Sequence, residues 1–477
     1  ASIDIVSKQE LPKIKLFDTY RRGIYEFQPL SDKQVTLYAC GPTVYDFAHI
    51  GNLRNYFFVD TLQRVLTLNN YNVKHVMNIT DVGHLTSDAD NGEDKMLKGA
   101  RKRGQSAWDI AKFFEDAFMR DLALLAIKTP TVICRATEHI DEQITYICAL
   151  EDQGFTYKTA DGIYFDTLKL DSYGHLARLD IAGLQAGKRV SIAQKKNITD
   201  FALWKFSVQE NDSSERQMQW QSPWGLGFPG WHIECSAMSE KYLGAAFDIH
   251  VGGEDHIPVH HSNEIAQCEG RHGKQPANFW MHGYFLQMGD EKISKSGRSL
   301  LLTQLQEQGY EALAFRYLLL TSHYRSKLRF SLKALDSATI ALKRIRNLMA
   351  QWPEGGQVNA QAQQRFLSFV NDDLKMPQAV AVLWSVAKSD LKNADKKATL
   401  LYFDEVFALS LDIPSKEATK ASTKNIPSEV LALAEQRLQA RENHNWVESD
   451  ALRAAILALG FSIKDSAQGY SLEAYIC

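Results

Sequence analysis

Hydrophobic and polar positions change their period several times along this chain, and each change predicts a different element. A strand-like run at 35–38 and a run at 73–80 that is typical of a buried strand flank a stretch in which Phe58, Leu62 and Val65 share one helical face. Strands that alternate with amphipathic helices are typical of a parallel sheet with helices on its faces. The first part of the chain is therefore predicted to have an α/β fold.

The predicted sheet is interrupted. Residues 12–130 supply its first half, and the same alternation returns over 201–300 to supply the second. Between them, 131–200 is expected to be an inserted subdomain, with a helix over 139–153 and a short hairpin. Ligands of such sheets bind at the carboxyl ends of the strands, so we expect a site where the two halves meet.

The last third of the chain is predicted to be helical. Apolar residues recur at helical spacing through 301–412, which indicates a helical bundle. The segment 413–427 is polar and contains two prolines, as linkers often do. A helix pair and a strand-like end follow at 428–477 and predict a small terminal domain.

Composition excludes some classes of protein. With 477 residues the chain is long enough for several domains, and its net charge of −3 gives no general support for nucleic-acid binding. There is no apolar stretch long enough to cross a membrane, and the first residues lack the apolar core of an export signal. Six cysteines in such a chain are therefore expected to be reduced thiols in the cytoplasm, available for metal binding.

Two short motifs carry the strongest chemical signal. HIGN at 49–52 follows a predicted strand and opens a predicted helix, whose N-terminal N–H groups and dipole favour phosphate. KISKS at 292–296 offers two lysines with small neighbours, which suit a polyphosphate. Each motif alone is weak, but together they predict one nucleotide site built from two distant segments.

The pair of motifs, about 240 residues apart, resembles the HIGH and KMSKS motifs of class I aminoacyl-tRNA synthetases. The flanking sequence resembles cysteinyl-tRNA synthetase from about residue 12 to the end of the chain. The stretches that carry this resemblance are CGPTVYDFAHIGNLR (40–54), NITDVGHL (78–85), PGWHIECSAM (229–238), FDIHVGGEDHIPVHHSNEIAQ (247–267) and FWMHGYFLQMGDEKISKS (279–296). The resemblance implies a Rossmann-like catalytic domain that links L-cysteine to tRNA(Cys) through a cysteinyl-adenylate.

Several thiol, imidazole and carboxylate side chains within these stretches suit a metal ion. His260 and Glu264 are four residues apart, so on a helix they project from one face. The resemblance assigns one zinc ion per chain to these two residues together with Cys40 and Cys235, and this donor set favours Zn²⁺ over Mg²⁺. Spacing alone leaves rival ligands open, namely His261, His256, Asp255 and Cys268.

The resemblance also implies which residues contact ATP, which is expected to bind with Mg²⁺. His49, Asn52, Lys292 and Lys295 are the predicted catalytic residues, with His49 on the α-phosphate and the lysines on the β- and γ-phosphates. The expected nucleotide-binding set comprises Gly41, His49, Gly51, Asn52, Gly252, Gly253, Asp255, Lys292 and Lys295. Asn52 departs from the fourth-position histidine of HIGH, and its side chain is expected to donate a hydrogen bond without carrying charge.

Thr80 and Trp231 are the residues predicted to bind the amino acid. Thr80, with Asp81, closes the NITD run, where a hydroxyl and a carboxylate would hold an ammonium group. Trp231 would form an aromatic wall beside the cysteine side chain, although core packing is an equal reading of this residue. His232 and Glu234 follow it closely and add polar groups.

In the resembled family the region after about 300 grips the tRNA stem, and the terminal domain binds the anticodon. Local basic residues would then meet tRNA, with candidates at Arg325, Lys327, Arg329, Lys343, Arg344 and Arg346. The chain is expected to act as a monomer. Two alternatives stay open: a synthetase-like ligase that joins cysteine to a small amine, and an inactive homologue that binds nucleic acid.

Overall fold

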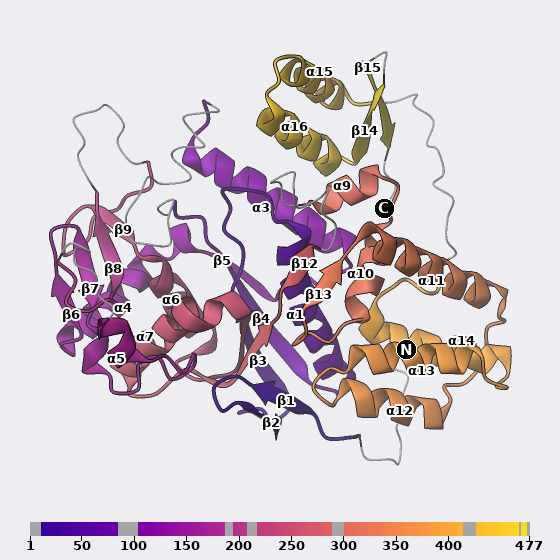
Figure 1. Ribbon diagram of the computed structural model, residues 1–477, viewed down its shortest axis with the longest axis horizontal. Coiled ribbons are helices and arrows are strands. Elements are labelled where there is room, and N and C mark those ends of the chain that lie inside the picture. Colours follow the sequence, from indigo (N-terminus) through magenta and orange to yellow (C-terminus); the bar gives the residue numbers. More distant parts are fainter. Residues whose placement is uncertain are drawn as a thin grey trace.

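A central sheet of five parallel strands forms within the described part of the chain, in the order β11-β10-β3-β4-β5. Figure 1 labels three of them, β3, β4 and β5, which are neighbours in this order. The computed structural model describes residues 11–83, 104–186, 194–207, 217–288, 300–413, 426–466 and 469–474. The strands are β3 (Gln34–Ala39), β4 (Asn72–Ile79), β5 (Val132–Arg135), β10 (Phe247–Gly253) and β11 (Ala277–Gly283). Because β3 pairs with β10 on one side and β4 on the other, the two predicted halves meet at β3. The predicted α/β fold is confirmed.

Strand β3 shows why this sheet is buried on both faces. Val35, Leu37 and Ala39 belong to one hydrophobic core, whereas Tyr38 and Cys40 belong to another. Successive side chains of a strand point to opposite faces, so buried residues of both sets require cover on both sides of the sheet. Helices α1 (Ile50–Leu68) and α3 (Ala107–Leu124) contribute to the first core, and α4 (Ile140–Asp152), α6 (Trp231–Leu243) and α7 (Ser262–His272) to the second.

The inserted subdomain has different limits from those expected at 131 and 200. Val132–Arg135 pairs in parallel with β4 and is the edge strand of the central sheet. In the described residues, the insert contains an antiparallel sheet in the order β6-β7-β8-β9. Its elements are β6 (Thr156–Lys158), β7 (Gly162–Phe165), α5 (Ile181–Ala186), β8 (Phe201–Phe206) and β9 (Gly227–Pro229). Because β8 is almost wholly buried, its sequence resembles that of a central parallel strand, which explains the misplaced boundary.

Helices follow the sheet, as predicted. They are α9 (Leu302–Glu307), α10 (Ala312–Leu320), α11 (Leu332–Gln351), α12 (Ala360–Val370), α13 (Met376–Ala387) and α14 (Asn393–Phe407). Their apolar faces join the core that also contains α1, so the bundle is continuous with the sheet domain. A short ribbon of β12 (Leu286–Met288) and β13 (Leu328–Phe330) lies between the two, and an N-terminal hairpin pairs β1 (Lys15–Asp18) with β2 (Gly23–Glu26).

The terminal module, residues 426–474, has its own core. Helices α15 (Ser428–Glu442) and α16 (Trp446–Ala458) pack on the hairpin of β14 (Phe461–Ser466) and β15 (Gly469–Ala474), and all buried residues of this core lie within the module. Figure 1 shows the module beside α3 and α9, where Arg453 Nε lies 2.6 Å from Glu307 Oε1. Most of the predicted linker, 414–425, lies outside the described residues.

The sequence predicted that the chain contains no membrane-spanning segment. Across the described ranges, no helix combines the length and apolar character needed to cross a lipid bilayer.

Candidate functional site

The predicted site residues gather at the carboxyl ends of the central strands. Cys40 directly follows β3, Thr80 follows β4, and Gly252 and Gly253 end β10. His49 stands at the start of α1, the helix that connects β3 to β4. At β3 the order in which strands are added to the sheet reverses, and the carboxyl ends of the strands at such a point are where open α/β sheets bind ligands.

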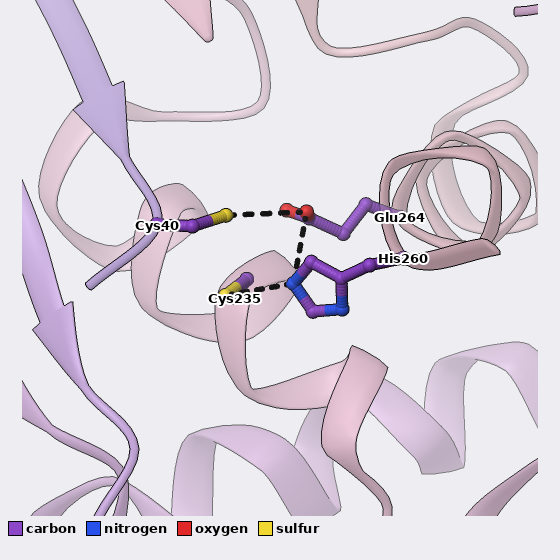
Figure 2. A group of neighbouring side chains, drawn as sticks. All are labelled: Cys40, Cys235, His260 and Glu264. Atoms are coloured by element: carbon purple, nitrogen blue, oxygen red, sulfur yellow. Dashed lines mark hydrogen bonds and ion pairs between the residues drawn. The ribbon is translucent and has the colours of Figure 1, made fainter. Parts of the chain in front are cut away.

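Four buried donors converge at this edge (Figure 2). His260 Nε2 lies 3.4 Å from Cys235 Sγ and 3.4 Å from Glu264 Oε2. Cys40 Sγ lies 3.9 Å from the same carboxylate oxygen. Donors around a tetrahedral zinc at normal bond lengths are separated by roughly 3.5 Å, so these spacings suit an ion at the centre of the group.

The local fold explains how distant residues reach this point. A side chain at Gly230 would place its Cβ 2.1 Å from the carbonyl oxygen of Ala202, so only glycine lets α6 begin this close to β8. Cys235 then lies one turn into α6 and is fully enclosed. His260 belongs to a π-helical turn over residues 257–261, and Glu264 lies in the first turn of α7. π-helical turns are often found at functional sites.

A second group of donors shares two members with the first. Cys40, His250, His261 and Glu264 also lie close enough together to hold a metal ion. His261 Nε2 is 3.3 Å from Cys40 Sγ, and its Nδ1 is 2.7 Å from His282 Nε2. His261 was named from the sequence as an alternative metal ligand, and its position in this second group agrees with that alternative. The other rivals Asp255, His256 and Cys268 belong to neither group found among the described residues.

Sequence reasoning missed His250 and His282. Each is a fully buried histidine near the carboxyl end of a central strand, His250 on β10 and His282 on the adjacent β11. Thr19 Oγ1 lies 2.8 Å from His282 Nδ1, which continues the chain of contacts outward from His261. A histidine in an otherwise apolar strand was the available signal, because such a ring needs a partner when it is buried.

Burial disfavours the charged forms of several side chains in and beside these groups. It raises the pKa of the Cys40 thiol well above its usual range, and the nearby Cys235 and Glu264 act in the same direction. It also lowers the pKa of the His261 and His282 rings, so that both are uncharged at neutral pH. A dication would reverse this balance, since coordinating thiols lose their protons to a bound metal.

The HIGN turn forms a reciprocal helix cap. The backbone N–H of Asn52 donates to His49 Nδ1 at 3.2 Å, and the backbone N–H of His49 donates to Asn52 Oδ1 at 3.0 Å. Since Nδ1 accepts, the neutral ring carries its proton on Nε2 and can donate from that atom. Burial lowers the pKa of His49, which favours this neutral form. The Asn52 side-chain oxygen accepts the bond from the His49 backbone and helps to orient His49, while donation from its amide nitrogen to ATP stays a prediction.

Three of the predicted glycines are required by close packing. A Cβ on Gly41 would lie 1.5 Å from the carbonyl oxygen of Asn78, and one on Gly252 would lie 2.5 Å from the His261 ring. At Gly51 the added Cβ would meet His49 Nδ1 at 2.9 Å, so this glycine leaves room for the capping ring. At these three positions, therefore, glycine lets the backbone lie closer to its neighbours than any residue with a side chain could.

The predicted amino-acid contacts flank the metal group. The Trp231 ring centroid lies 5.2 Å from that of His260, and the Trp231 side chain is only half-buried. His232 Nδ1 lies 2.9 Å from His260 Nδ1. Thr80 Oγ1 accepts from Asn78 Nδ2 at 3.0 Å. The Asp81 carboxylate is held by the N–H and hydroxyl of Thr137 at 2.9 and 2.6 Å, so this carboxylate already has two partners.

Other predicted residues are placed differently or fall outside the described chain. Lys292 and Lys295 lie in the segment 289–299, outside the described residues. Arg346 was a candidate for tRNA contact, but it is buried and donates to Leu409 O, with Nη1 2.7 Å from Glu311 Oε2. Arg325 is bound to Asp373 at 2.8 Å. Lys343 and Arg344 do lie exposed on α11.

Comparison with known proteins gives one consistent family. Residues 26–340 match the family model described as tRNA synthetases class I (C) catalytic domain. The chain is 54% identical to cysteine–tRNA ligase 1 of Burkholderia lata, with 96% of each chain covered. It is 41% identical to cysteine–tRNA ligase of Treponema denticola, covering 95% of this chain and 98% of the relative.

Solved structures support the fold at much lower identity. A methionyl-tRNA synthetase of Mycobacterium tuberculosis bound by methionyl-adenylate matches with a TM-score of 0.52 and 15% identity, covering 79% of this chain and 90% of that one. The LeuRS–tRNA–LeuAMS ternary complex from Agrobacterium radiobacter K84 matches with a TM-score of 0.55 and 11% identity, covering 81% and 84%. At these identities the likeness concerns the fold alone.

Proposed function

Because this chain belongs to the cysteine–tRNA ligases of class I, we propose that it joins L-cysteine to tRNA(Cys) with ATP and selects cysteine through a bound zinc ion. The observation that carries the proposal is the buried group of Cys40, Cys235, His260 and Glu264 at the edge of the sheet where α1 begins. The group that selects cysteine would then lie next to the predicted ATP site at the start of α1.

The donor set fits zinc better than magnesium. Two thiols, an imidazole and a carboxylate are the ligands of zinc sites, whereas Mg²⁺ prefers oxygen donors alone. Zinc, when bound, supplies a Lewis acid that prefers a thiolate to a neutral hydroxyl. This chemistry matters because cysteine and serine differ by one atom, and a pocket that reads size alone gains only about 1–3 kcal/mol of discrimination.

The chain's own residues would hold the two substrates in line. His49, with its proton on Nε2, donates toward the α-phosphate of ATP, and Lys292 and Lys295 neutralise the β- and γ-phosphates. A carboxylate oxygen of cysteine forms a bond to the α-phosphorus while the bond to the bridging oxygen breaks. Cysteinyl-adenylate and pyrophosphate result, and a terminal ribose hydroxyl of tRNA then takes the cysteinyl group and releases AMP.

Around the amino acid, Thr80 and Trp231 would hold the substrate without reacting. Trp231 would cover the side chain from beside His260, which lies within ring-contact distance. The Thr80 hydroxyl would contact the ammonium group, while Asp81, already held by Thr137, would add negative charge nearby. In the nucleotide half, Gly252, Gly253 and Asp255 would line the ribose and adenine.

We assign tRNA binding to the helical region and the terminal module. Four exposed side chains remain as candidates for phosphate contacts along 301–412, namely Lys327, Arg329, Lys343 and Arg344. Residues 428–477 would read the anticodon. We further expect a monomer in the cytoplasm. The described cysteines are unpaired, which suits a reducing compartment.

Cysteine-dependent exchange of pyrophosphate into ATP tests the first half-reaction, and charging of tRNA(Cys) tests the second. The zinc-loaded enzyme should carry out both and should reject serine in the exchange. Exchange without tRNA charging, but with consumption of a small amine, would instead identify a synthetase-like cysteine ligase. No exchange at all would identify an inactive homologue.

The metal assignment needs its own variants. His260→Ala should remove the metal, whereas His261→Ala should leave most of it, because His261 contacts Cys40 and belongs only to the second group. Metal content measured by mass spectrometry distinguishes the two sets directly. The opposite result would transfer the site to Cys40, His250, His261 and Glu264.

A further inference from the structure

Arg54, two residues after the HIGN motif, is a buried arginine that contacts several neutral oxygens. Only 4% of its surface is exposed. Its Nη1 donates to the carbonyl oxygens of Tyr284 and Phe285 at 2.8 and 2.9 Å. Its Nη2 donates to the carbonyl oxygens of His323 and Ser326 at 3.0 and 2.7 Å and to the Ser322 hydroxyl at 3.3 Å. One side chain therefore holds two separate loops.

These loops begin the two strands of the β12–β13 ribbon. Tyr284 and Phe285 connect β11 to β12, and the loop 322–326 connects α10 to β13. The loops also bond to each other, because Tyr284 N donates to Tyr324 O at 2.8 Å and Leu328 N donates to Phe285 O at 3.2 Å. Strand β12 ends at Met288, immediately before the chain segment that contains Lys292 and Lys295.

Helix α1 also contacts the chain beyond that segment. The backbone N–H of Ile50 donates to Leu300 O at 2.9 Å. The first turns of α1 therefore fix the chain both at Tyr284–Phe285, shortly before the KISKS motif, and at Leu300, shortly after it. His49, the predicted α-phosphate donor, lies at the start of the same helix.

We propose that Arg54 is a positioning residue for ATP, which sets the place of the β12–β13 ribbon relative to His49. The inference rests on the proposed function and adds a residue to it. A guanidinium is suited to this task because its planar fork donates in several fixed directions at once, which an ammonium on a flexible stem does not reproduce. Glu254 supports the same loop, since its Oε1 accepts from Phe285 N at 3.3 Å.

The arrangement is costly for a purely structural contact. Burial lowers the pKa of Arg54 to about 10, which reflects the loss of water around the charge, with Glu254 acting in the opposite direction. Apolar packing of similar volume often stabilises a fold as well as a buried charge does. What apolar packing cannot supply is a fixed direction for two loops at once, and catalysis of phosphoryl chemistry depends on such positioning.

Arg316 offers a matched control. It is also fully buried, and its Nη2 lies 2.8 Å from Asp60 Oδ2 while its other donors reach Phe407 O at 2.6 Å and Leu125 O at 2.9 Å. These partners join the middle of α10 to α1, to the end of α3 and to the end of α14, and none of them lies in the two loops that Arg54 binds. Replacement of Arg316 should therefore lower the stability of the fold without changing kcat/KM for ATP.

The test compares Arg54→Lys and Arg316→Lys in the zinc-loaded, full-length enzyme. For Arg54→Lys we expect kcat/KM for ATP in cysteine-dependent exchange to fall about 10- to 100-fold, because small misplacement of reacting groups has effects of this size. The KM for cysteine and the zinc content should stay unchanged. Arg316→Lys should lower Tm with the ATP parameters unchanged. Equal ATP parameters in Arg54→Lys and the wild-type enzyme would overturn the proposal.

Ile50→Pro provides a second, independent variant in case Arg54→Lys fails to fold. Ile50 is the first residue of α1, where the backbone suits proline, and His49 has the extended backbone that precedes a proline. The Ile50 side chain is buried, so Ile50→Ala, which keeps the backbone N–H, is the control for lost packing. Ile50→Pro removes the hydrogen bond to Leu300 O and should raise the KM for ATP without changing the KM for cysteine. An unchanged KM for ATP would contradict the proposed anchoring. If the wild-type enzyme itself showed no exchange, the proposed function would fail instead.

Discussion

His250 Nε2 lies 2.9 Å from Glu264 Oε1, so one oxygen of this carboxylate is held by a residue on a neighbouring strand. The other oxygen, Oε2, is the one that lies near His260 and Cys40. The contact fixes the rotation of the carboxylate and directs Oε2 toward the centre of the donor group. Residues that orient metal ligands in this way tune the affinity of a site without binding the ion themselves.

Replacing His250 should therefore weaken metal binding without abolishing it. We expect His250→Phe to lower zinc affinity about 10- to 100-fold, the usual effect of losing such a supporting contact. Competition with a chromogenic chelator measures the affinity. His139→Phe is the matched control, because His139 is also buried but contacts Arg135 O and Tyr242 Oη, outside the donor group. An unchanged affinity in His250→Phe would show that Glu264 needs no support.

His75 should make the protein sensitive to acid. This ring is buried on β4, and neither ring nitrogen has a hydrogen-bond partner among the described residues. Burial lowers its pKa to about 4, so the folded state keeps the ring neutral while the unfolded chain takes up a proton below its ordinary value of 6.5. The contribution is present at neutral pH and is lost as the pH falls through 6.5 toward 4.

The expected effect of His75 is about 2 kcal/mol of stability lost between pH 7.5 and pH 5. His75→Leu should remove this part of the pH dependence and retain the apolar packing. Urea unfolding of the two proteins at both pH values measures the difference. Parallel pH dependence in the variant and the wild type would show that His75 does not titrate as its burial implies.

Lys295 is predicted to contact the phosphates of ATP. Removing a charged donor that faces developing phosphate charge should slow cysteine-dependent exchange by roughly 10²–10³ in Lys295→Ala, with the KM for cysteine nearly unchanged. Lys343→Ala is the control, because Lys343 is an exposed lysine on α11, outside the β12–β13 ribbon, and should not affect exchange. A decrease of less than about threefold in Lys295→Ala would contradict the predicted role.

The terminal module should be needed for tRNA but not for adenylate formation. A chain that ends at Asp412 keeps the sheet, the donor group and the bundle, and the module's core contains only its own residues. It should retain exchange, whereas tRNA charging should lose about 100-fold in kcat/KM, since a linked second site is removed. The salt dependence of tRNA binding should become shallower. Unchanged charging would show that 428–477 does not read tRNA, and lost exchange would show that it supports the catalytic fold.

The sequence predicted the larger organisation because its periods are long and strong. The helix that begins after His49 and the helix pair of the terminal module are each longer than ten residues, and the split sheet follows from the alternation of strands with such helices. The limits of the insert were wrong because β5 spans only Val132–Arg135, too short to show a period, and because β8 is buried like a central strand.

The donor group was only partly predictable. Spacing identifies His260 and Glu264, which are four residues apart, but Cys40 and Cys235 meet them only through the tertiary fold. His250 contacts Glu264, and His282 contacts His261, both in the helical segment after β10, and no local pattern encodes these contacts. Likewise, the sequence indicates that Asn52 lies at a helix start, but it does not predict the hydrogen bond between its side chain and the His49 backbone.

The central claim is that Cys40, Cys235, His260 and Glu264 hold a metal ion that distinguishes cysteine from serine. Substitution with Co²⁺ tests it most directly, because cobalt bound to thiolates has a sulfur-to-metal charge-transfer band. We expect such a band in the wild-type protein and a weaker one in Cys235→Ser. In the wild-type protein, the intensity of the band should increase on addition of cysteine but not of serine. A band that cysteine and serine change equally, or that Cys235→Ser leaves intact, would contradict the account.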